Sequence, residues 1–560
     1  SLVPIGERGT LELHGPDLDA SERRLLQVIA TQLDAAIEHG ALASAAEEAS
    51  ELAETDKAKA REAEVSAFVE SGESQPTANG QSLYAGTRLG DQDGGHGHVG
   101  AVVSRLDRPS KDEWFDGQDA ETAMFTGGVS AGRFSANVMA YKDEGRFEMQ
   151  RGVTLTGAID ASKWYYDPLK TTVMSADMTM AWSEDQVTLL SLFGTKYEQT
   201  EYNEYFDGRA SLAMRHFEEK TRGYNLRHNA RFGGTLVQLG TQYTQSEGFG
   251  PNTNTPYNDW KTSVQGWSAS VEQKLLNDRV VLDAGYRRDI KHIDHSAVSA
   301  TALAANSGTD LAPARTFTLG ARWKINDMFA LNGRYFDGHE GTAGDFDIRT
   351  KSGADLHAAE QKRTEVALEA NLMPSFRPTL TWFDVDIKNQ KTATSSTYVV
   401  DGQTYYYYTE SDALRRGLEL LIKGDIGART SYSVAWTHMS DNETTSDGAV
   451  SDALDLSSPS DIYTARLSHG WGAYRLNFSY KRVGAWSQST SPMGVMTNLD
   501  LGNYDRIDAN VARDFLVGGQ RLTAKLYGRN LGNDRYATRY TTGYYYDRGR
   551  TIGVEVTAKF

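Results

Sequence analysis

Residues Thr171–Tyr197 read TTVMSADMTMAWSEDQVTLLSLFGTKY, and this stretch decides the fold class. A polar turn, Ser183–Gln186, separates two segments in which apolar and polar residues alternate. Alternation with a period of two is the pattern of a β-strand that has one apolar and one polar face. The stretch therefore predicts a β-hairpin.

The same design recurs along the chain. Phe317–Lys324 and Phe329–Tyr335 flank the turn Ile325–Met328, and Tyr463–Tyr480 holds another alternating pair. Long polar connections, such as Asp441–Pro459, alternate with these short turns. Short turns at one end and longer loops at the other are typical of outer-membrane β-barrels.

The length of the chain indicates a large barrel. A strand needs about 9 to 11 residues to cross a bilayer, so the roughly 475 residues after Gln81 supply on the order of 22 strands with their loops. Aromatic residues at predicted strand ends fit the girdles of membrane barrels: Tyr197, Tyr243, Tyr335 and Trp382. We therefore predict an all-β protein, a large antiparallel transmembrane β-barrel of about 22 strands, with a short helical N-terminal segment.

The composition excludes several other classes of protein. No run of 18 apolar residues occurs and the mean hydropathy is -0.53, which excludes a helical membrane protein but not a barrel, in which only alternate residues face lipid. A net charge of -17 argues against a nucleic-acid partner. The absence of cysteine excludes disulfides and thiolate metal sites.

The first part of the chain has a different character. Residues 1–84 hold 16 Asp/Glu against 6 Lys/Arg, and Ser21–Glu70 shows helical spacing of apolar residues. Gly72–Gln81 has the composition of a linker. We predict two parts, a helical N-terminal segment with linker over residues 1–80 and an outer-membrane β-barrel over residues 81–560.

The N-terminal part also carries a resemblance. Gly9–Leu13 (GTLEL) followed by Ser21–His39 resembles the end of a GAF domain and the helix leading out of it in KdpD-type sensor histidine kinases, within residues 1–60. The phosphoacceptor histidine box and the ATP-binding motifs of those kinases are absent, so kinase activity is not carried over. A signalling role through this segment remains an alternative.

The C-terminus resembles the closing strands of TonB-dependent receptors. The two matching stretches are Arg521–Tyr536 (RLTAKLYGRNLGNDRY) and Tyr544–Phe560 (YYYDRGRTIGVEVTAKF). In that family an Asn-Leu pair lies in the penultimate hairpin, Gly-Arg opens the last strand and an aromatic residue ends the chain. The matching barrel-closing residues are Asn530, Leu531, Gly549, Arg550 and Phe560. Further resemblance lies at Glu360, Glu365, Leu380–Asn389 and Arg416–Glu419.

This resemblance implies a receptor in the outer membrane of a Gram-negative cell that takes up a scarce nutrient such as a ferric siderophore. The implied partners are outer-membrane lipid and a small-molecule ligand such as a metal chelate, with no resident cofactor. Such receptors begin with a TonB-contacting box and a plug, and the sequence matches neither. TonB is therefore expected as a partner only if a plug is supplied, and an unplugged passive pore or ligand-binding barrel is the alternative.

Two tyrosine-rich stretches are candidates for ligand binding. Aromatic faces near a barrel rim can stack on an aromatic chelate or a sugar ring. The alternative for both stretches is interfacial anchoring or a β-rich hairpin tip. The candidate residues are Tyr405, Tyr406, Tyr407, Tyr408, Tyr544, Tyr545 and Tyr546.

Two groups of residues could hold a metal ion, with calcium or a substrate metal as candidates. Glycine-rich loops with an occasional histidine are the alternative explanation. The first group is Asp91, Asp93, His96 and His98, and the second is His292 and His295.

Two motifs suggest catalysis, and the context of each argues against it. Gly95–Gly100 (GHGHVG) has the spacing of a dinucleotide fingerprint, but the β-like Val99–Val103 follows where a helix is required. Gly128–Gly132 (GVSAG) matches a nucleophile elbow but lies where hairpins are predicted. We therefore predict no catalytic residue and no enzyme.

Overall fold

The structure is a computed structural model of the whole chain. It describes residues 2–5, 9–12, 61–72, 76–91, 95–211, 214–250, 258–296, 308–339, 351–353, 356–400, 403–446, 448–452, 454–456, 458–490, 497–541 and 543–560. The predicted helical segment falls mostly on residues 13–60, which lie outside these ranges, and the signalling alternative lies there too.

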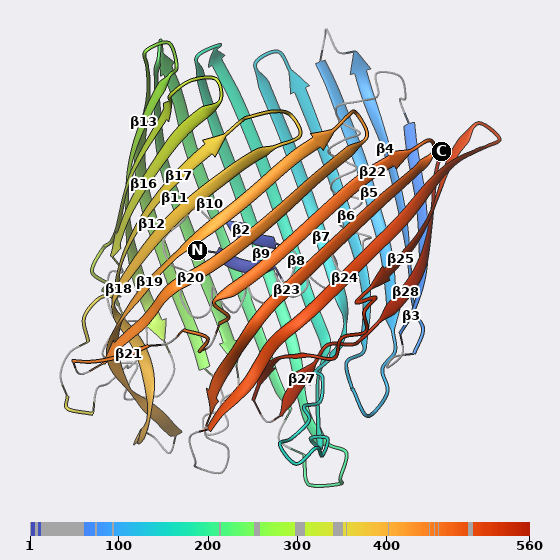
Figure 1. Cartoon of the computed structure of the whole chain (residues 1–560), viewed down its shortest axis with the longest axis vertical. Coiled ribbons are helices and arrows are strands. Elements are labelled where there is room, and N and C mark those ends of the chain that lie inside the picture. The colour runs from blue at the N-terminus through green and yellow to red at the C-terminus, as the bar shows by residue number, and fades with distance from the viewer. Residues whose placement is uncertain are drawn as a thin grey trace.

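The described residues form strands throughout (Figure 1). The strands before the first long loops are β1 (Leu2–Ile5), β2 (Gly9–Glu12), β3 (Arg61–Gly72), β4 (Ala78–Asp91), β5 (Gly95–Arg108), β6 (Gln118–Ala131), β7 (Phe134–Glu148), β8 (Ser162–Ser183), β9 (Gln186–Tyr205), β10 (Arg215–Phe232), β11 (Thr235–Gly250), β12 (Asn258–Leu275) and β13 (Val280–Ser296). They are followed by β14 (Thr309–Asp310), β15 (Ala314–Lys324), β16 (Phe329–His339), β17 (Glu360–Ala370), β18 (Arg377–Val400), β19 (Gln403–Ile426), β20 (Thr430–Ser446), β21 (Ala449–Asp452), β22 (Asp461–Trp471), β23 (Tyr474–Thr490), β24 (Thr497–Val517), β25 (Gln520–Arg529), β26 (Ala537–Tyr540), β27 (Tyr544–Tyr546) and β28 (Thr551–Lys559).

Neighbouring strands pair antiparallel around a closed barrel, and β28 closes the sheet on β3. The short β14 and β21 are additional strands beside β13 and β20, because β13 also pairs with β15 and β20 with β22. Within the described ranges the wall therefore has 22 strands, which confirms the predicted antiparallel barrel and its size. The hairpin predicted over Thr171–Tyr197 is confirmed as β8 and β9, which join through the turn after Ser183.

No helix that could cross a membrane occurs among the residues that the structure describes.

The barrel begins earlier in the chain than the sequence predicted. Strand β3 occupies Arg61–Gly72, within the stretch predicted to be helical, and β4 starts inside the predicted linker. Thr551 pairs with Gly72 and Lys559 with Glu64, so β3 is the strand that closes the ring. The boundary near residue 80 is wrong because the Glu and Ala residues of this stretch also suit a strand with a polar inner face.

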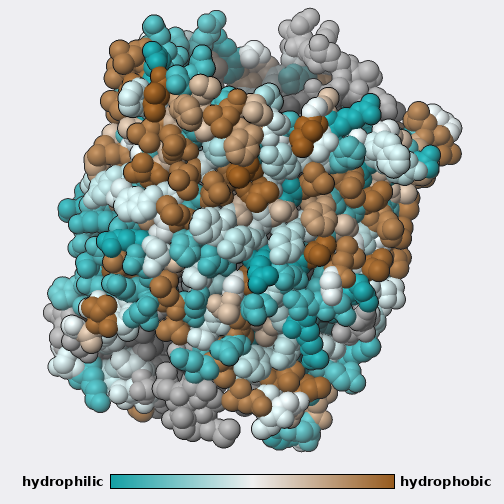
Figure 2. Space-filling model, viewed as in Figure 1, coloured by the Kyte–Doolittle hydropathy of each residue, from teal (hydrophilic) through white to brown (hydrophobic). Residues whose placement is uncertain are grey.

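The outer face of the barrel is apolar, as a lipid-facing wall requires. In β28 the side chains of Ile552 and Val554 are 50% and 49% exposed, whereas the alternate residues Thr551 and Thr557 are buried. Figure 2 shows apolar side chains gathering over the upper half of this face and hydrophilic ones below. Alternation between lipid and lumen explains why the mean hydropathy of the whole chain is low.

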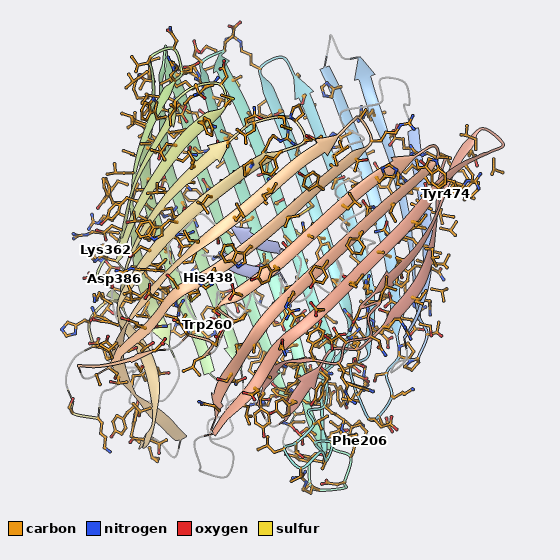
Figure 3. All side chains as sticks on the ribbon, viewed as in Figure 1. Phe206, Trp260, Lys362, Asp386, His438 and Tyr474 are labelled. Carbon is orange, nitrogen blue, oxygen red and sulfur yellow. The ribbon has the colours of Figure 1, made fainter. Side chains whose placement is uncertain are left out.

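The two ends of the barrel differ. Short turns join the strands at the end drawn at the top of Figure 1, and long connections lie at the bottom. We call these the turn end and the loop end; Tyr474 marks the first and Phe206 the second in Figure 3. Strands β18 and β19 have 24 residues each. A bilayer crossing needs about 9 to 11 residues, so these two strands are more than twice as long as a crossing requires.

Candidate functional site at the loop end

Residues 530–550, which join β25 to β28, form what we call the closing loop. Asn530 begins it with a φ of 45° and only 1% exposure, a left-handed conformation that asparagine tolerates. Its backbone N–H donates to Oδ1 of Asp508 (2.7 Å), and its Nδ2 donates to Oδ1 of Asp547 (2.7 Å) and to the carbonyl of Asp534 (2.9 Å). The buried Asn530 side chain therefore joins the two ends of the closing loop, and the Asn530 backbone ties them to Asp508 of the wall.

Asp547 is the second anchor. Its carboxylate also accepts from the N–H of Gly549 (2.9 Å) and from the hydroxyl of Tyr536 (3.1 Å). Burial raises the pKa of the Asp547 carboxyl, although the hydrogen bond from Asn530 and the charge of Arg506 oppose that rise. Ionisation of the Asp547 carboxyl in the folded protein is therefore less favourable than in water.

A buried ion-pair network lies beneath the closing loop, on the lumen side of the wall where β28 pairs with β3. Glu70 of β3 is 4% exposed and accepts from the hydroxyl of Tyr527 (3.1 Å) and from Nη1 of Arg529 (3.3 Å). Nη2 of Arg108, itself 2% exposed, lies 3.8 Å from Glu70. Buried charges persist only when they are paired, so this network ties the first strand to β5 and β25.

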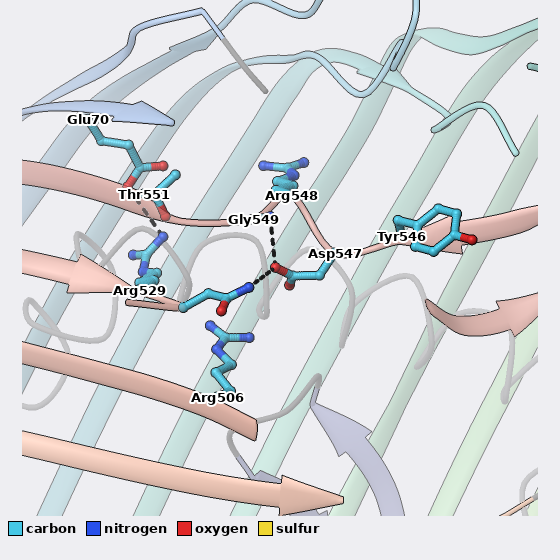
Figure 4. A pocket seen from close by; sticks show the side chains of 9 residues that line it. Glu70, Arg506, Arg529, Tyr546, Asp547, Arg548, Gly549 and Thr551 are labelled. Carbon is cyan, nitrogen blue, oxygen red and sulfur yellow. Dashed lines mark hydrogen bonds and ion pairs between the residues drawn. The ribbon is translucent and has the colours of Figure 1, made fainter. Parts of the chain in front are cut away.

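A cavity of about 150 Å³ separates the network from the closing loop (Figure 4). Arg548 contributes to its outer side and forms an ion pair with Asp116 (3.1 Å), which draws in the β5–β6 loop. The volume suits several ordered water molecules or one small polar group. The cavity is lined by Glu70, Arg506, Arg529, Asn530, Tyr546, Asp547, Arg548, Gly549 and Thr551.

The closing loop also crosses part of the barrel mouth. Its hairpin of β26 and β27 meets the β7–β8 loop, where Val153 and Tyr544 exchange backbone hydrogen bonds of 2.9 and 2.8 Å. Nε2 of Gln150 donates to the carbonyl of Tyr546 (2.7 Å). Because β3 to β6 lie between β28 and β7 in the wall, these contacts bridge one sector of the opening.

An aromatic cluster joins three other loop-end segments. Phe115 packs edge-on against Tyr165 (6.2 Å between ring centroids) and Phe206 (5.3 Å), and Tyr165 stacks on Tyr202 (4.8 Å). The Arg146 guanidinium lies 4.2 Å from the ring centre of Tyr165. These contacts fix the β5–β6, β7–β8 and β9–β10 connections to one another.

Arg151 extends that cluster. Its guanidinium lies 4.3 Å from the ring centre of Phe206 and donates to the carbonyls of Asp160 and Asp112, at 2.6 Å each. Burial lowers the pKa of Arg151. The Arg151 side chain therefore links the loops through these contacts and is not available as a free cation.

The structure places the two candidate tyrosine groups on different elements. Tyr544, Tyr545 and Tyr546 form β27, where Arg539 lies 4.5 Å from the ring centre of Tyr545 and Arg535 lies 4.7 Å from that of Tyr546. The other four lie on β19, where Tyr405 pairs with Tyr398 of β18 and the Tyr407 ring lies 4.8 Å from the Tyr398 ring: Tyr405, Tyr406, Tyr407 and Tyr408. A ligand role for either group stays a prediction.

The candidate metal ligands lie apart from the closing loop. His96 and His98 are on β5 next to the turn end, and Asp93 lies outside the described residues. His292 pairs instead with Asp310 (2.8 Å). Among the described residues no group of three or more His, Asp or Glu side chains is arranged to hold a metal ion, and metal binding by these residues stays a prediction. Asp91 is the last residue of β4, His96 and His98 lie on β5, and His292 and His295 lie on β13.

Sequence reasoning found part of this site. Four of the predicted barrel-closing residues lie in the closing loop, and Phe560 follows β28 and exchanges backbone hydrogen bonds with Ala63; the four are Asn530, Leu531, Gly549 and Arg550. The buried partners Glu70, Arg108 and Arg506 were missed because strand pairing brings them together from distant parts of the chain. The nearest sequence signal was Asp547, which stands between the tyrosines and the Gly-Arg pair.

The comparison with protein families matches residues 108–531 to the family described as TonB dependent receptor-like, beta-barrel. That range covers most of the chain. The chain belongs to the TonB-dependent receptor barrels. Members of this family are outer-membrane transporters rather than enzymes, and the family implies a ligand such as a ferric chelate and interaction with TonB.

Solved structures share the fold of this TonB-dependent receptor barrel. The ferripyoverdine receptor of Pseudomonas aeruginosa is 14% identical, with a TM-score of 0.71 over 90% of this chain and 72% of the receptor. The FrpB iron transporter from Neisseria meningitidis is also 14% identical, with a TM-score of 0.68 over 90% and 82%. The copper transporter OprC is 11% identical, with a TM-score of 0.67 over 89% and 80%.

One curated protein is similar to a short segment of this chain. The sensor protein KdpD of Rathayibacter rathayi is 69% identical over 58 residues. The match covers 10% of this chain and 7% of that protein, so it transfers no activity.

Proposed function

We propose that this barrel takes up a scarce nutrient, such as a ferric siderophore, across the outer membrane of a Gram-negative cell. Support comes from family membership over residues 108–531 and from relatives of the same fold that include iron transporters. The loop end would capture the ligand, and the barrel would provide its path.

The observation that carries the proposal is the construction of the closing loop. Exposed Arg535 and Arg539 each lie against a tyrosine ring of β27, on a hairpin that is held across the mouth. Guanidinium groups beside aromatic faces suit an anionic ligand with aromatic rings, which is the chemistry of many iron chelates.

Coupling to TonB is part of the proposal. The family implies such an interaction, and uptake against a gradient requires an energy source. In this scheme a plug, from this protein or another, would respond to TonB and release the captured ligand into the lumen.

Uptake of radioactive iron tests the proposal. The full chain would be expressed in a Gram-negative strain without its own chelate receptors and offered a panel of ferric chelates. We expect uptake of at least one chelate that disappears in a strain lacking TonB. Replacement of Arg535 and Arg539 by alanine should weaken it, whereas the control Arg209→Ala, which removes a similar cation–ring contact at Tyr205 (4.3 Å), should not.

A passive pore or ligand-binding barrel is the second candidate. It is favoured by one observation: between residues 61 and 560, the described residues all belong to the wall, its turns or its loops. Uptake that is unaffected by loss of TonB and that rises linearly with chelate concentration would support the pore and contradict the receptor proposal.

A further inference from the structure

Two arginines stand side by side on the outer wall. Arg288 of β13 lies directly opposite Arg315 of β15, and both are exposed. Tyr286, two residues before Arg288, is 47% exposed, and Phe317, two residues after Arg315, is 40% exposed. Because residues two apart on a strand share a face, both guanidinium groups project from the apolar outer face rather than into the lumen.

The position of the pair along the strands matches a membrane border. Arg288 is the ninth residue of β13 from the turn end, and Arg315 is the tenth residue of β15 counted back from Lys324. About 9 to 11 residues cross the hydrocarbon layer. The pair therefore lies where the apolar belt ends on the side of the loops, at the level of the outer-leaflet headgroups.

The two guanidinium groups place like charges at directly opposite positions of neighbouring strands. Side chains directly opposite each other on adjacent strands are about 5 Å apart at Cβ, and like charges there repel. Within the described part of the chain, neither guanidinium has a hydrogen-bond or ion-pair partner.

The neighbouring acidic groups are already engaged. His339, opposite Arg315 on β16, lies 3.1 Å from Asp337 and 3.3 Å from Glu360. Asp337 also accepts from the hydroxyl of Tyr335 (3.3 Å). On its other side Arg288 is flanked by Trp267, which is 47% exposed. The row thus presents two cations next to an indole ring.

Two other basic residues at a similar height are paired with carboxylates. Lys196 of β9 lies 2.8 Å from Glu198 and 3.3 Å from Glu218, and Lys220 of β10 also pairs with Glu218 (2.5 Å). Such exposed pairs leave little net charge for a ligand. The arginine pair on β13 and β15 differs because, among the residues that the structure describes, neither guanidinium forms an ion pair with a carboxylate.

We propose that Arg288 and Arg315 form a binding site for the phosphate of an outer-leaflet lipid headgroup, with Trp267 beside the phosphate and Tyr286 against the lipid beneath it. Two planar guanidinium groups offer paired N–H donors that match phosphate oxygens, and the phosphate removes their mutual repulsion. Tryptophan and tyrosine prefer this border between headgroups and hydrocarbon. The site is independent of the transport proposal, since it lies on the outside of the barrel.

Native mass spectrometry of the full chain in detergent tests the site, with bisphosphorylated lipid A as the probe. We expect the double variant Arg288→Gln/Arg315→Gln to bind lipid A about tenfold more weakly or worse, since it loses charge-assisted hydrogen bonds. Arg288→Lys/Arg315→Lys should retain part of the affinity. The matched control Lys196→Gln should bind like the parent protein, and heat-modifiable gel migration would show that each variant is folded.

Two further arms separate the possible sources of binding. Lipid A without its phosphates should bind the parent protein as weakly as the double variant binds intact lipid A, and equal binding of both lipids would overturn the proposal. Inorganic phosphate alone should fail to compete at the same concentration. Effective competition would show a site for a free anion and would also overturn it, as would unchanged lipid A binding by the double variant.

Discussion

Asn530 is the residue on which the closing loop depends most. Its side chain holds Asp547 and the carbonyl of Asp534 in a place that is 1% exposed. Asn530→Ala removes the side-chain donor to the carbonyl of Asp534 and one of three donors to Asp547, which costs about 1 to 3 kcal/mol. We therefore expect proteases to cleave residues 531–550 roughly ten to a hundred times faster, because cleavage follows the population of the released loop.

Limited proteolysis followed by mass spectrometry measures this change. Asn477→Ala is the control, since Asn477 also donates to another asparagine side chain (Asn510, 3.0 Å) but is exposed on the wall. Equal cleavage of the parent and Asn530→Ala would show that the closing loop has other sufficient anchors.

The raised pKa of Asp547 predicts that the stability of the closing loop depends on pH. Its folded pKa is raised, chiefly by burial, so the stability linked to this group is complete at pH values below its unfolded pKa, about 3.9, and is lost as the pH rises through the folded pKa. Lowering the pH from about 7 toward 4 should therefore protect the loop in the parent protein. Asp547→Asn cannot titrate and keeps an oxygen that accepts from Asn530.

The measurement is the ratio of loop cleavage rates in the parent protein and in Asp547→Asn at each pH. The ratio cancels the pH dependence of the protease itself. We expect it to fall as the pH is lowered, and a ratio that rises instead would mean that the ionised carboxylate stabilises the loop.

Among the elements, β3 has the largest consequence for the fold. It supplies the partner for both β28 and β4. A chain that begins at Ala78 leaves two long unpaired edges, which a membrane does not tolerate. We expect this chain to lose heat-modifiable migration on gels, whereas a chain that begins at residue 58 should keep it. Folding of the shorter chain would mean that β4 can pair with β28 directly.

The contrast between β3 and the predicted hairpins shows what a sequence can reveal. In Thr171–Tyr197 the outer positions carry Met and Leu, so the period of two was visible. In Arg61–Gly72 the outer positions include Ala67 and the inner ones Glu64 and Glu70, residues that also favour a helix. Closure itself joins residues almost five hundred positions apart, and no local pattern records that pairing.

The residues of the candidate site also fall into those that the sequence could reveal and those that it could not. Asn530 and Gly549 could be recognised because the family places them in short motifs at the end of the chain. Arg108 and Glu70 could not, because each is an ordinary charged residue until two distant strands bury them together. The outward-facing Arg288 and Arg315 also could not be predicted as a pair, since only the strand register places them side by side.

At the scale of the whole molecule, we expect the closing loop to limit the width of the channel entrance. A barrel of this width leaves an aqueous channel unless something fills it. The closing loop reaches the β7–β8 loop through Val153 and Tyr544, and Nε2 of Gln488 on β23 donates to the carbonyl of Tyr540 (2.8 Å). The hairpin is thus fixed at both sides, and we expect it to narrow the entrance.

Single-channel conductance in a planar bilayer tests this arrangement. Replacement of Ala537–Tyr546 by a short Gly-Ser turn should raise the conductance relative to the parent chain, because it removes the hairpin that crosses the opening. Shortening the tip of β18 and β19 is the control: these strands pair with each other up to Val400 and Gln403, so their tip needs no contact across the mouth. Equal conductance of the parent and the Gly-Ser variant would place the narrowest point elsewhere. A silent parent with a conducting variant would make the closing loop the gate of the barrel.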